Sequence, residues 1–394
     1  MTTWPEVTLA EVSAKPQYGA IASAEDQAVG PKFVRQTDII SGRVDWATVP
    51  YAALTPADTL KYSLQEGDLL ISRLGAGVGN AARMDATEGS VFAGYLVRFR
   101  VRPEVADSRF VGYALQSYQW RSHVQAVRSG GAQPTLNAKQ MGIFRFALQP
   151  LGEQERIAGV LGAFDDLIET NRRLIDRMDE LAVTRANDLA SRASTAPRTF
   201  ADVAAIGGGG TPSTKVPEYW GGEHPWATPK DITALPSRFL FDTPRKLTDA
   251  GLAKCSSPLR PVGSVLMTSR ATVGEFALAE IPVAVNQGFI VVNGDAPEDT
   301  TWLYFEMRRR VPEFQTVASK GSTFPEISRR EFKALQLRWP GEGDRERLHR
   351  EVAPLLAASA QLEREVAELT RQRDELLPLL MSGRVRVRDL EAVA

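Results

Sequence analysis

The residue types that most often carry catalysis are sparse in this sequence of 394 residues. It contains one cysteine, Cys255, and three histidines, His123, His224 and His349. A single cysteine excludes a disulfide within the chain and a cysteine-based zinc cluster, and the histidines lack the spacing of metal ligands. No combination of serine, histidine and aspartate, or of cysteine and histidine, has supporting local sequence. The sequence therefore predicts neither a catalytic set nor a metal site.

Two glycine-rich stretches are the next candidates, as nucleotide-binding loops. Gly75–Asn80 has the sequence GAGVGN, but the residues after it lack the helical spacing of apolar residues that a nucleotide loop requires. A hairpin loop near bound DNA, or a plain structural turn, fits this stretch better. Gly207–Gly210 lacks the Gly-Lys-Ser/Thr of a phosphate loop, so we expect a flexible loop there. Neither stretch predicts a cofactor on this chain.

Composition indicates an ordinary soluble globular protein. Hydrophobic residues make up 43%, charged residues 24%, and the formal net charge is -1. That balance gives no overall attraction to nucleic acid or membrane. The N-terminus has neither a basic start nor an apolar segment, and no apolar run is long enough to span a membrane, so we expect a cytoplasmic location.

The elements that must position any site are duplicated. The second half of the chain repeats the first at an offset of about 191 residues, and the matches keep their order. The matched segments are Val7–Val12 with Arg198–Val203, Gly67–Arg73 with Gly263–Ser269 (Arg270 follows one place later), Gly130–Pro134 with Gly321–Pro325, and Glu155–Ile157 with Glu346–Leu348. The sequence predicts four parts: globular domains at 1–150 and 194–340, and long helices at 151–193 and 341–394, with Ser191–Pro197 as the linker between repeats.

Each globular part has an α+β pattern. Leu96–Val101 alternates apolar and basic residues, which predicts a half-buried strand, and Gly288–Val292 predicts a core strand. Arg109–Val127 and Thr301–Ala318 have the composition of helices. The globular parts carry a small excess of basic residues and the helical parts a small excess of acidic ones. This distribution favours globules that meet a polyanion and helices that meet protein.

The helical parts have apolar residues at alternating spacings of four and three, as in a coiled coil. We call these positions the seam. In the first helix they run from Ile157 to Ala182, with Asn171 as a polar member that fixes register, and in the second from Leu348 to Leu380. Pro354 and Pro378 predict a kink or break, and Gly383 predicts the end of the second helix. Val160, Leu167 and Leu174 lie beside the seam and make the apolar stripe wider than two helices need, which favours further helices docking on it.

Polar and basic residues in the glycine-containing loops are the candidates for reading a nucleic acid. Arg or Lys recognises guanine, Asn or Gln recognises adenine, and Ser, Thr and Lys hold phosphates. Their occurrence at matching places in both repeats supports this interpretation. The candidates are Arg73, Asn80, Arg128, Ser129, Gln133 and Thr135 in the first repeat, and Lys230, Ser269, Arg270, Lys320, Ser322 and Thr323 in the second.

The helical motifs resemble those of a known family. Pro150–Ile157, with Phe164–Ile168 and Asn171, resembles the central conserved helix of type I restriction–modification specificity subunits. Arg373–Val385 resembles the distal end of their second helix. Gly209–Ser213 and Trp226–Ile232 resemble the opening of one of their target recognition domains. The resemblance covers the whole chain in the family's order, although Trp339–Glu346 lacks the Glu-Gln pair found at Glu153-Gln154.

The resemblance implies an α+β, pseudo-twofold architecture, with two target recognition domains separated by two long antiparallel helices. It implies a chain without catalytic activity that reads a split, asymmetric DNA sequence. Two adenine methyltransferase subunits would dock on the helices and restriction subunits would join them. S-adenosylmethionine and ATP would belong to those partners. A helix of about 40 residues is roughly 60 Å long, enough to act as a ruler between half-sites roughly 34 Å apart.

Two other functions stay open. An adaptor whose globules bind protein would need no DNA-facing loops and would fail to bind duplex DNA at any salt concentration. A self-contained methyltransferase or nuclease is less well supported, because the chain has no Asp/Asn-Pro-Pro-Tyr/Phe sequence. Glu331-Phe-Lys333 matches the end of a nuclease motif, but its counterpart in the first repeat, Gln140-Met-Gly142, does not keep it, so we attribute the match to chance.

Overall fold

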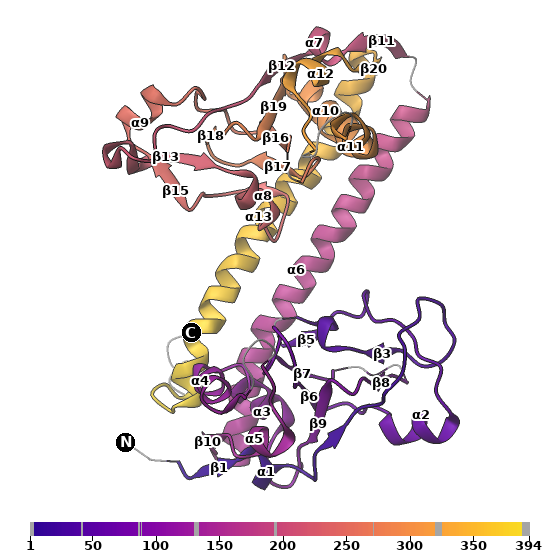
Figure 1. Cartoon of the computed structure of the whole chain (residues 1–394), viewed down its shortest axis with the longest axis vertical. Coiled ribbons are helices and arrows are strands. Elements are labelled where there is room, and N and C mark those ends of the chain that lie inside the picture. Colours follow the sequence, from indigo (N-terminus) through magenta and orange to yellow (C-terminus); the bar gives the residue numbers. More distant parts are fainter. Residues whose placement is uncertain are drawn as a thin grey trace. The chain divides into compact units, whose positions relative to one another are not determined.

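A computed structural model describes residues 4–40, 42–85, 87, 89–129, 134–192, 195–270, 272–319 and 325–387. The chain forms two compact units. Unit 1 comprises Met1–Glu169 and Ala367–Ala394, and unit 2 comprises Thr170–Val366. Each unit contains one globule and part of both long helices, α6 (Leu151–Arg192) and α13 (Glu342–Met381), which are magenta and yellow in Figure 1.

The main sheet of unit 1 is antiparallel, in the order β2 (Gln17–Tyr18), β9 (Leu96–Arg100), β6 (Asp68–Ser72), β7 (Ala81–Arg83). β6 is wholly buried, and β9 alternates buried and half-buried residues in its last four positions, which confirms the half-buried strand expected there. The predicted helix Arg109–Val127 is instead two helices, α3 (Ser108–Ala114) and α4 (Tyr118–Val127). Ser117 breaks it, because its hydroxyl donates to the Ala114 carbonyl (2.7 Å) and accepts from the Trp120 amide (3.2 Å).

Shorter elements complete unit 1. A parallel pair joins Phe33–Val34 to Val91–Phe92, and a terminal antiparallel pair ties the start of the globule to its end. These elements are β1 (Glu6–Thr8) with β10 (Arg145–Ala147), α1 (Leu9–Val12), β3 (Phe33–Val34) with β8 (Val91–Phe92), the 3₁₀ turn η1 (Gln36–Asp38), β4 (Ile39–Ile40) with β5 (Arg43–Val44), α2 (Pro56–Tyr62) and α5 (Ala138–Gly142).

Unit 2 has a five-stranded main sheet. Its order is β12 (Ala204–Gly207), β19 (Phe289–Gly294), β16 (Val265–Thr268), β17 (Phe276–Ala279), β14 (Phe239–Leu240). β19 confirms the predicted core strand, since its first four residues are buried. The predicted helix Thr301–Ala318 is again two, α10 (Pro297–Arg309) and α11 (Val311–Ala318). Pro312 accounts for the break, because proline has no N–H to continue the helical hydrogen bonds.

A second sheet of unit 2 lies beside the first, and among the described residues of unit 1 it has no full counterpart. Its order is β15 (Arg245–Leu247), β13 (Trp220–Ala227), β18 (Ala284–Val285). The predicted linker Ser191–Pro197 is partly structured, because its last residues begin β11 (Thr195–Thr199), which pairs with β20 (Gln336–Pro340). The remaining elements are α7 (Phe200–Val203), η2 (Pro217–Tyr219), α8 (Pro229–Thr233), α9 (Asp249–Lys254) and α12 (Arg329–Ala334).

Segments that match in the sequence repeat make the same hydrogen bonds in the two units. The Thr8 amide donates to Glu11 (2.6 Å) and the Thr199 amide to Asp202 (2.7 Å), so the same short helix opens each globule. The parallel pair Phe33–Val91 of unit 1 corresponds to Trp226–Ala284 of unit 2. The two globules therefore share one α+β fold, built twice from different side chains.

The long helices run antiparallel within each unit. In unit 1, Gln149, just before α6, donates to the Met381 carbonyl (2.9 Å), while Asp165 pairs with Arg373 (2.7 Å). In unit 2, Ser359 lies 3.5 Å from the Met178 sulfur, and Arg185 lies 3.6 Å from Glu351. In both units, residues later in α6 meet residues earlier in α13, which is the antiparallel order that we expected.

The predicted seam is confirmed by burial. Every seam residue of α6 and α13 is buried or half-buried, including Asn171 and Ser359. Outside the seam, three leucines of α6 spaced seven residues apart remain exposed: Leu167 by 49%, Leu174 by 44% and Leu181 by 43%. The helix pair covers only part of the apolar surface of α6.

The predicted break at the prolines of α13 is wrong. The helix is continuous through Pro354 and Pro378, and both rings are at exposed positions where they displace no packed side chain. The predicted stop at Gly383 is confirmed. Gly383 has φ +69° and its amide donates to Leu380, while the Arg384 amide donates to Leu379, which is the Schellman pattern of helix termination.

The two helices also begin alike, despite the missing Glu-Gln pair. The Gln154 amide group donates to the Gln149 carbonyl (2.7 Å) and accepts from the Asp107 amide (2.9 Å). At the matching place in unit 2, Arg345 donates to the Pro340 carbonyl and to Asp299 (2.6 Å). A guanidinium thus replaces an amide in anchoring the helix to its globule.

Candidate nucleic-acid interface

The candidate residues of unit 1 gather at one end of its main sheet. Arg73 directly follows β6, where its amide donates to the Tyr95 carbonyl (3.0 Å) and its carbonyl accepts from the Leu136 amide (2.9 Å). The next residue, Leu74, forms a β-bridge with Thr135. We call this set of backbone hydrogen bonds the loop frame. It brings three separate loops together at the sheet's end.

Four more of the sequence candidates lie in the segments around the loop frame. Ser129 and Thr135 exchange backbone hydrogen bonds of 3.0 and 2.7 Å, and their hydroxyls lie 3.1 Å apart. Arg128 precedes them and is exposed. Asn80 is exposed at the foot of the β6–β7 hairpin, which confirms the hairpin loop expected at Gly75–Asn80.

Arg73 is prearranged by an aromatic ring. Its guanidinium lies 5.0 Å from the centre of the Tyr18 ring, and its Nε atom is buried without a hydrogen-bond partner. Among the residues that the structure describes, no carboxylate forms an ion pair with it. Tyr18 is 41% exposed, so an aromatic ring supports a cation at the surface. This combination suits contact with bases and phosphates.

Unit 2 repeats the backbone hydrogen bonds of the loop frame, but its arginine stands one residue later in the chain than the arginine of unit 1. Here the Ser269 amide donates to the Gly288 carbonyl (2.8 Å) and the Ser269 carbonyl accepts from the Ile327 amide (2.9 Å). Ser269 therefore occupies the place of Arg73, and Arg270 occupies the place of Leu74. Because successive side chains of an extended chain point to opposite sides, the two arginines leave the frame on opposite sides.

Arg270 lies in a polar cluster of unit 2. A Cβ atom on Gly288 would lie 2.7 Å from Pro229, 3.1 Å from the Asn286 side chain and 3.3 Å from Arg270 Nε, so these groups surround the glycine. Pro229 begins α8, where the exposed Lys230 comes next. Ser269 is only 3% exposed, so it supports this cluster from beneath.

Four candidates fall on parts of the chain that the structure does not describe. They are Gln133 in unit 1 and Lys320, Ser322 and Thr323 in unit 2. Their proposed DNA contacts stay predictions from the sequence.

The glycines at Gly207–Gly210 are packed, which corrects the flexible loop expected there. A Cβ on Gly209 would lie 1.7 Å from the Val285 carbonyl oxygen, and one on Gly210 would lie 2.0 Å from the Ser256 hydroxyl. The Gly210 carbonyl accepts from the Trp226 indole (3.1 Å). Close approach of the backbone, rather than flexibility, explains these glycines.

Comparison with known proteins decides between the classes of function left open above. The family described as the type I restriction modification DNA specificity domain matches residues 1–179 and 195–344. The chain belongs to this family. The two matched segments fall one on each repeat, so duplication is a property that this chain shares with the specificity family.

Similarity to individual proteins is lower. The chain is 34% identical to the type I restriction enzyme MjaIX specificity subunit of Methanocaldococcus jannaschii, over 37% of this chain and 34% of that protein. It therefore spans about a third of that relative's length. It is 18% identical to the putative MjaX specificity subunit of the same organism, over 94% of this chain and 91% of the relative. A crystal structure of a type I restriction–modification S subunit from M. genitalium shares the fold, with a TM-score of 0.66, 15% identity and 96% coverage of both chains.

Sequence reasoning missed several polar residues of this specificity-family chain. Gln287 is exposed and its amide oxygen accepts from Thr211 (2.7 Å), and Asn286 lies beside it near Arg270. In unit 1, Gln36 accepts from Ser72 (3.1 Å) at the sheet end. Asparagine and glutamine are the usual partners of adenine. These residues become candidates only because the fold brings their loops close to the arginines. None of them lies in a glycine-rich stretch that both repeats share, so the sequence pattern did not mark them.

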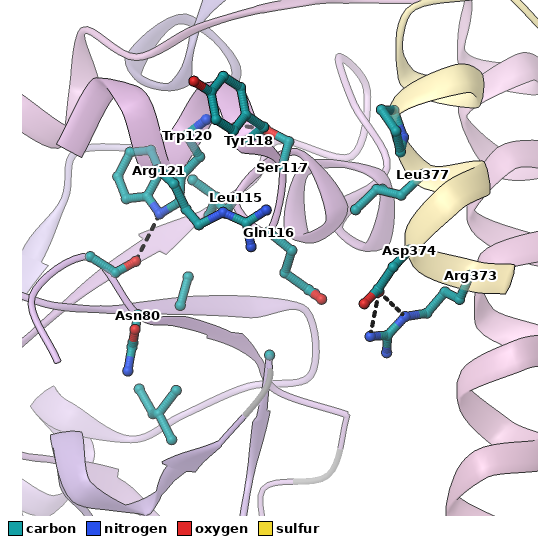
Figure 2. Close-up of a pocket in the computed structure, with 15 residues that line it drawn as sticks. Asn80, Leu115, Gln116, Ser117, Tyr118, Trp120, Arg121, Arg373, Asp374 and Leu377 are labelled. Atoms are coloured by element: carbon teal, nitrogen blue, oxygen red, sulfur yellow. Dashed lines mark hydrogen bonds and ion pairs between the residues drawn. The ribbon is translucent and has the colours of Figure 1, made fainter. Parts of the chain in front are cut away.

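A cavity of about 530 Å³, lined by both polar and apolar residues, lies within unit 1, between the α3–α4 turn and the end of α13. Figure 2 shows Gln116 extending towards Asp374 and Arg373, with Asn80 on the opposite wall. Arg373 is held by Asp374 (2.8 Å) and Asp165 (2.7 Å). Within the described residues no group of three or more His, Cys, Asp or Glu side chains is placed to hold a metal ion, and no helix is long and apolar enough to cross a membrane.

Proposed function

We propose that this chain is the DNA-reading subunit of a type I restriction–modification complex and that each unit reads one half of a bipartite, asymmetric duplex site. One observation carries the proposal. The two units repeat the same loop frame but place Arg73 and Leu74 on it in unit 1, against Ser269 and Arg270 in unit 2. Because side chains read base edges, equal frames with different side chains select different bases.

Binding would begin with attraction to phosphates and be completed by base contacts. Arg73, Arg128, Lys230 and Arg270 form no ion pair with any carboxylate among the described residues, so these cations are available to an anionic ligand. A good bidentate contact to a base contributes about 1–3 kcal/mol of discrimination. Tethering two readers makes the second encounter intramolecular, which raises affinity without new contacts.

The partners in this proposal are two adenine methyltransferase subunits and, where the system restricts DNA, restriction subunits. The exposed leucines of α6 support docking of further helices, since a heptad-spaced apolar row on a helix packs against another helix. This chain would bind neither S-adenosylmethionine nor ATP and would have no catalytic activity of its own. Both cofactors would belong to the partner subunits.

Selection of bound duplexes from a random pool tests the function. The full-length chain, with its methyltransferase partners, should enrich one sequence with two unlike specified segments and an unspecified gap. Affinity should fall steeply as salt concentration rises, because binding displaces counterions from phosphates. Failure to bind duplex DNA at any salt concentration would instead favour a protein-binding adaptor. Methylation by the chain alone would contradict the non-catalytic role.

A further inference from the structure

Two arginines converge on the glycines that open the packed loop of unit 2. Arg260 Nη2 donates to the Gly208 carbonyl (2.9 Å). A Cβ on Gly207 would lie 2.3 Å from the same nitrogen, and one on Gly208 would lie 3.1 Å from Arg329 Nε. The absence of side chains at these two glycines is what lets both guanidinium groups approach the strand end.

Neither guanidinium is neutralised. In the part of the chain that the structure describes, no carboxylate forms an ion pair with Arg260 or Arg329. The Nε atom of Arg260 is buried and has no hydrogen-bond partner. Burial and the positive charge of Arg329 lower the pKa of Arg260. Two like charges brought together without a counter-ion repel each other, and a bound anion would relieve that repulsion.

Unit 1 shows the same strand position in a neutralised form. By sheet register, Gln17 occupies the place of Gly207 and Tyr18 the place that follows it. The guanidinium beside Gln17 belongs to Arg98, and it lies 3.6 Å from the buried carboxylate of Asp68. In unit 2 the position of Asp68 is taken by Ser264, directly after the matched glycine. Unit 2 therefore has a cation here, supplied by Arg260 from a different segment, without the carboxylate.

The arginine pair lies at the DNA-reading end of unit 2. Gly207 pairs with Val291 at the end of the sheet where Thr268 pairs with Phe289. Ile327, two residues before Arg329, donates to the Ser269 carbonyl (2.9 Å), so α12 begins beside the loop frame. The Arg329 side chain lies where the Arg73 side chain lies in unit 1, although the two residues come from different loops, because Arg73 covers Tyr18 and Arg329 covers the matching Gly208. Each unit thus has one guanidinium at this point, supplied from a different loop.

We propose that Arg260 and Arg329 together hold one backbone phosphate of the half-site that unit 2 reads. The proposal rests on the proposed DNA-reading function. Guanidinium groups present paired N–H donors that match phosphate oxygens, and phosphate contacts fix the orientation of a DNA-binding protein without reading sequence. Arg329 supplies an exposed guanidinium, while Arg260 is the partly buried member, anchored by Gly208.

The test compares Arg329→Gln with Arg330→Gln in the full-length chain. Both substitutions remove one positive charge from the start of α12, and both positions are exposed, but only Arg329 approaches Gly208. Arg329→Gln should weaken binding of the selected duplex roughly tenfold and lower the slope of log affinity against log salt by about 0.9, with base preferences unchanged. Arg330→Gln should change affinity no more than twofold. Arg260→Lys, which keeps the charge, should retain the slope while weakening binding.

The outcomes separate this proposal from the function on which it rests. If the unmodified chain selects no duplex sequence, the proposed function fails. If it selects one and Arg329→Gln leaves affinity and salt slope unchanged, or alters a base preference, the phosphate contact is refuted. Inorganic phosphate gives the second arm. Stabilisation of the unmodified chain by millimolar phosphate, together with unchanged DNA binding by Arg329→Gln, would assign the pair to a free anion instead. Equal melting temperatures would show that the variants fold.

Discussion

At the scale of single residues, the proposed function makes the base preference of each half-site depend on which side chain occupies a shared backbone position. Arg73 is supported by an aromatic ring, whereas Arg270 lies among Pro229, Asn286 and the turn at Gly288. These surroundings differ although the hydrogen bonds beneath them are the same. Each arginine should therefore act on its own half-site alone.

We predict that Arg270→Ala relaxes or abolishes selection at the half-site of unit 2 only. Loss of a bidentate base contact should reduce discrimination there by about 1–3 kcal/mol. Sequencing of duplexes bound by the variant measures this. Arg338→Ala removes an exposed arginine of the same unit that lies in β20, paired with β11 and not part of the loop frame, and it serves as the control. An unchanged half-site after Arg270→Ala would remove that residue from the interface.

The ring beneath Arg73 gives a second residue-scale prediction. Tyr18→Ala should weaken binding at the half-site of unit 1 a few-fold, because a cation–π contact at an exposed site contributes roughly 0.5–1 kcal/mol. Tyr18→Phe keeps the ring and loses the hydroxyl that accepts from the Ala138 amide (3.1 Å). Competition assays with duplexes altered in one half-site measure both variants. Equal losses for the two variants would mean that the hydroxyl, not the ring, matters.

Sequence reasoning could find the arginines but not their environment. The glycine, polar and basic composition of the loops marks Arg73 and Arg270, and the repeat suggests that they are related. The repeat alignment already shows that Arg270 follows one place after the match to Arg73. What holds each position is visible only through hydrogen bonds to residues about 60 positions away in the chain, such as Leu136 and Ile327. Asn286, Gln287 and Arg329 were missed for the same reason, because tertiary pairing alone brings them to the sheet end.

At the scale of elements, periodicity predicted the long helices well and the short ones poorly. A seam sustained over many turns outweighs local interruptions, so α13 continues through two prolines that would end an isolated helix. In the globules the helices are short, and single residues decide their ends. Ser117 and Pro312 each divide a stretch that has the composition of one helix.

The end of α13 provides a prediction at this scale. Gly383→Ala should destabilise unit 1 by about 1–2 kcal/mol or more, because φ is +69° there and a Cβ would lie 2.7 Å from the Trp4 indole nitrogen. Thermal unfolding of the full-length chain measures the loss. Gly152→Ala is the matched control, since a Cβ there meets no atom within 4 Å and alanine favours helix. A lower melting temperature for both variants alike would contradict the explanation.

At the scale of the whole molecule, duplication is the central feature. Under the proposed function, a fold built twice, with a long helix after each copy, would let one chain carry two independent specificities. The family assignment and the repeated loop frame agree on this organisation. The net charge of the whole chain gives no sign of this duplication, because the basic globular parts and the acidic helical parts nearly cancel to -1.

Helix length should set the gap between half-sites. We predict that inserting one heptad in α6 and one in α13, at matched points, lengthens the preferred gap by up to about three base pairs, since seven helical residues add roughly 10 Å. Seven residues keep the seam in register, whereas an insertion of five residues does not and should abolish binding. Selection from pools with variable gaps measures the change. A preferred gap that stays constant in the heptad variant would refute the ruler.

Mapping of methylated adenines across the genome, with and without this gene, tests the central claim most directly. The account predicts that one bipartite motif with unlike halves loses methylation when the gene is deleted. When Arg270→Ala replaces the natural chain, only the half-site read by unit 2 should change. Methylation that is unchanged by the deletion, or a lost motif that is a palindrome, would contradict it.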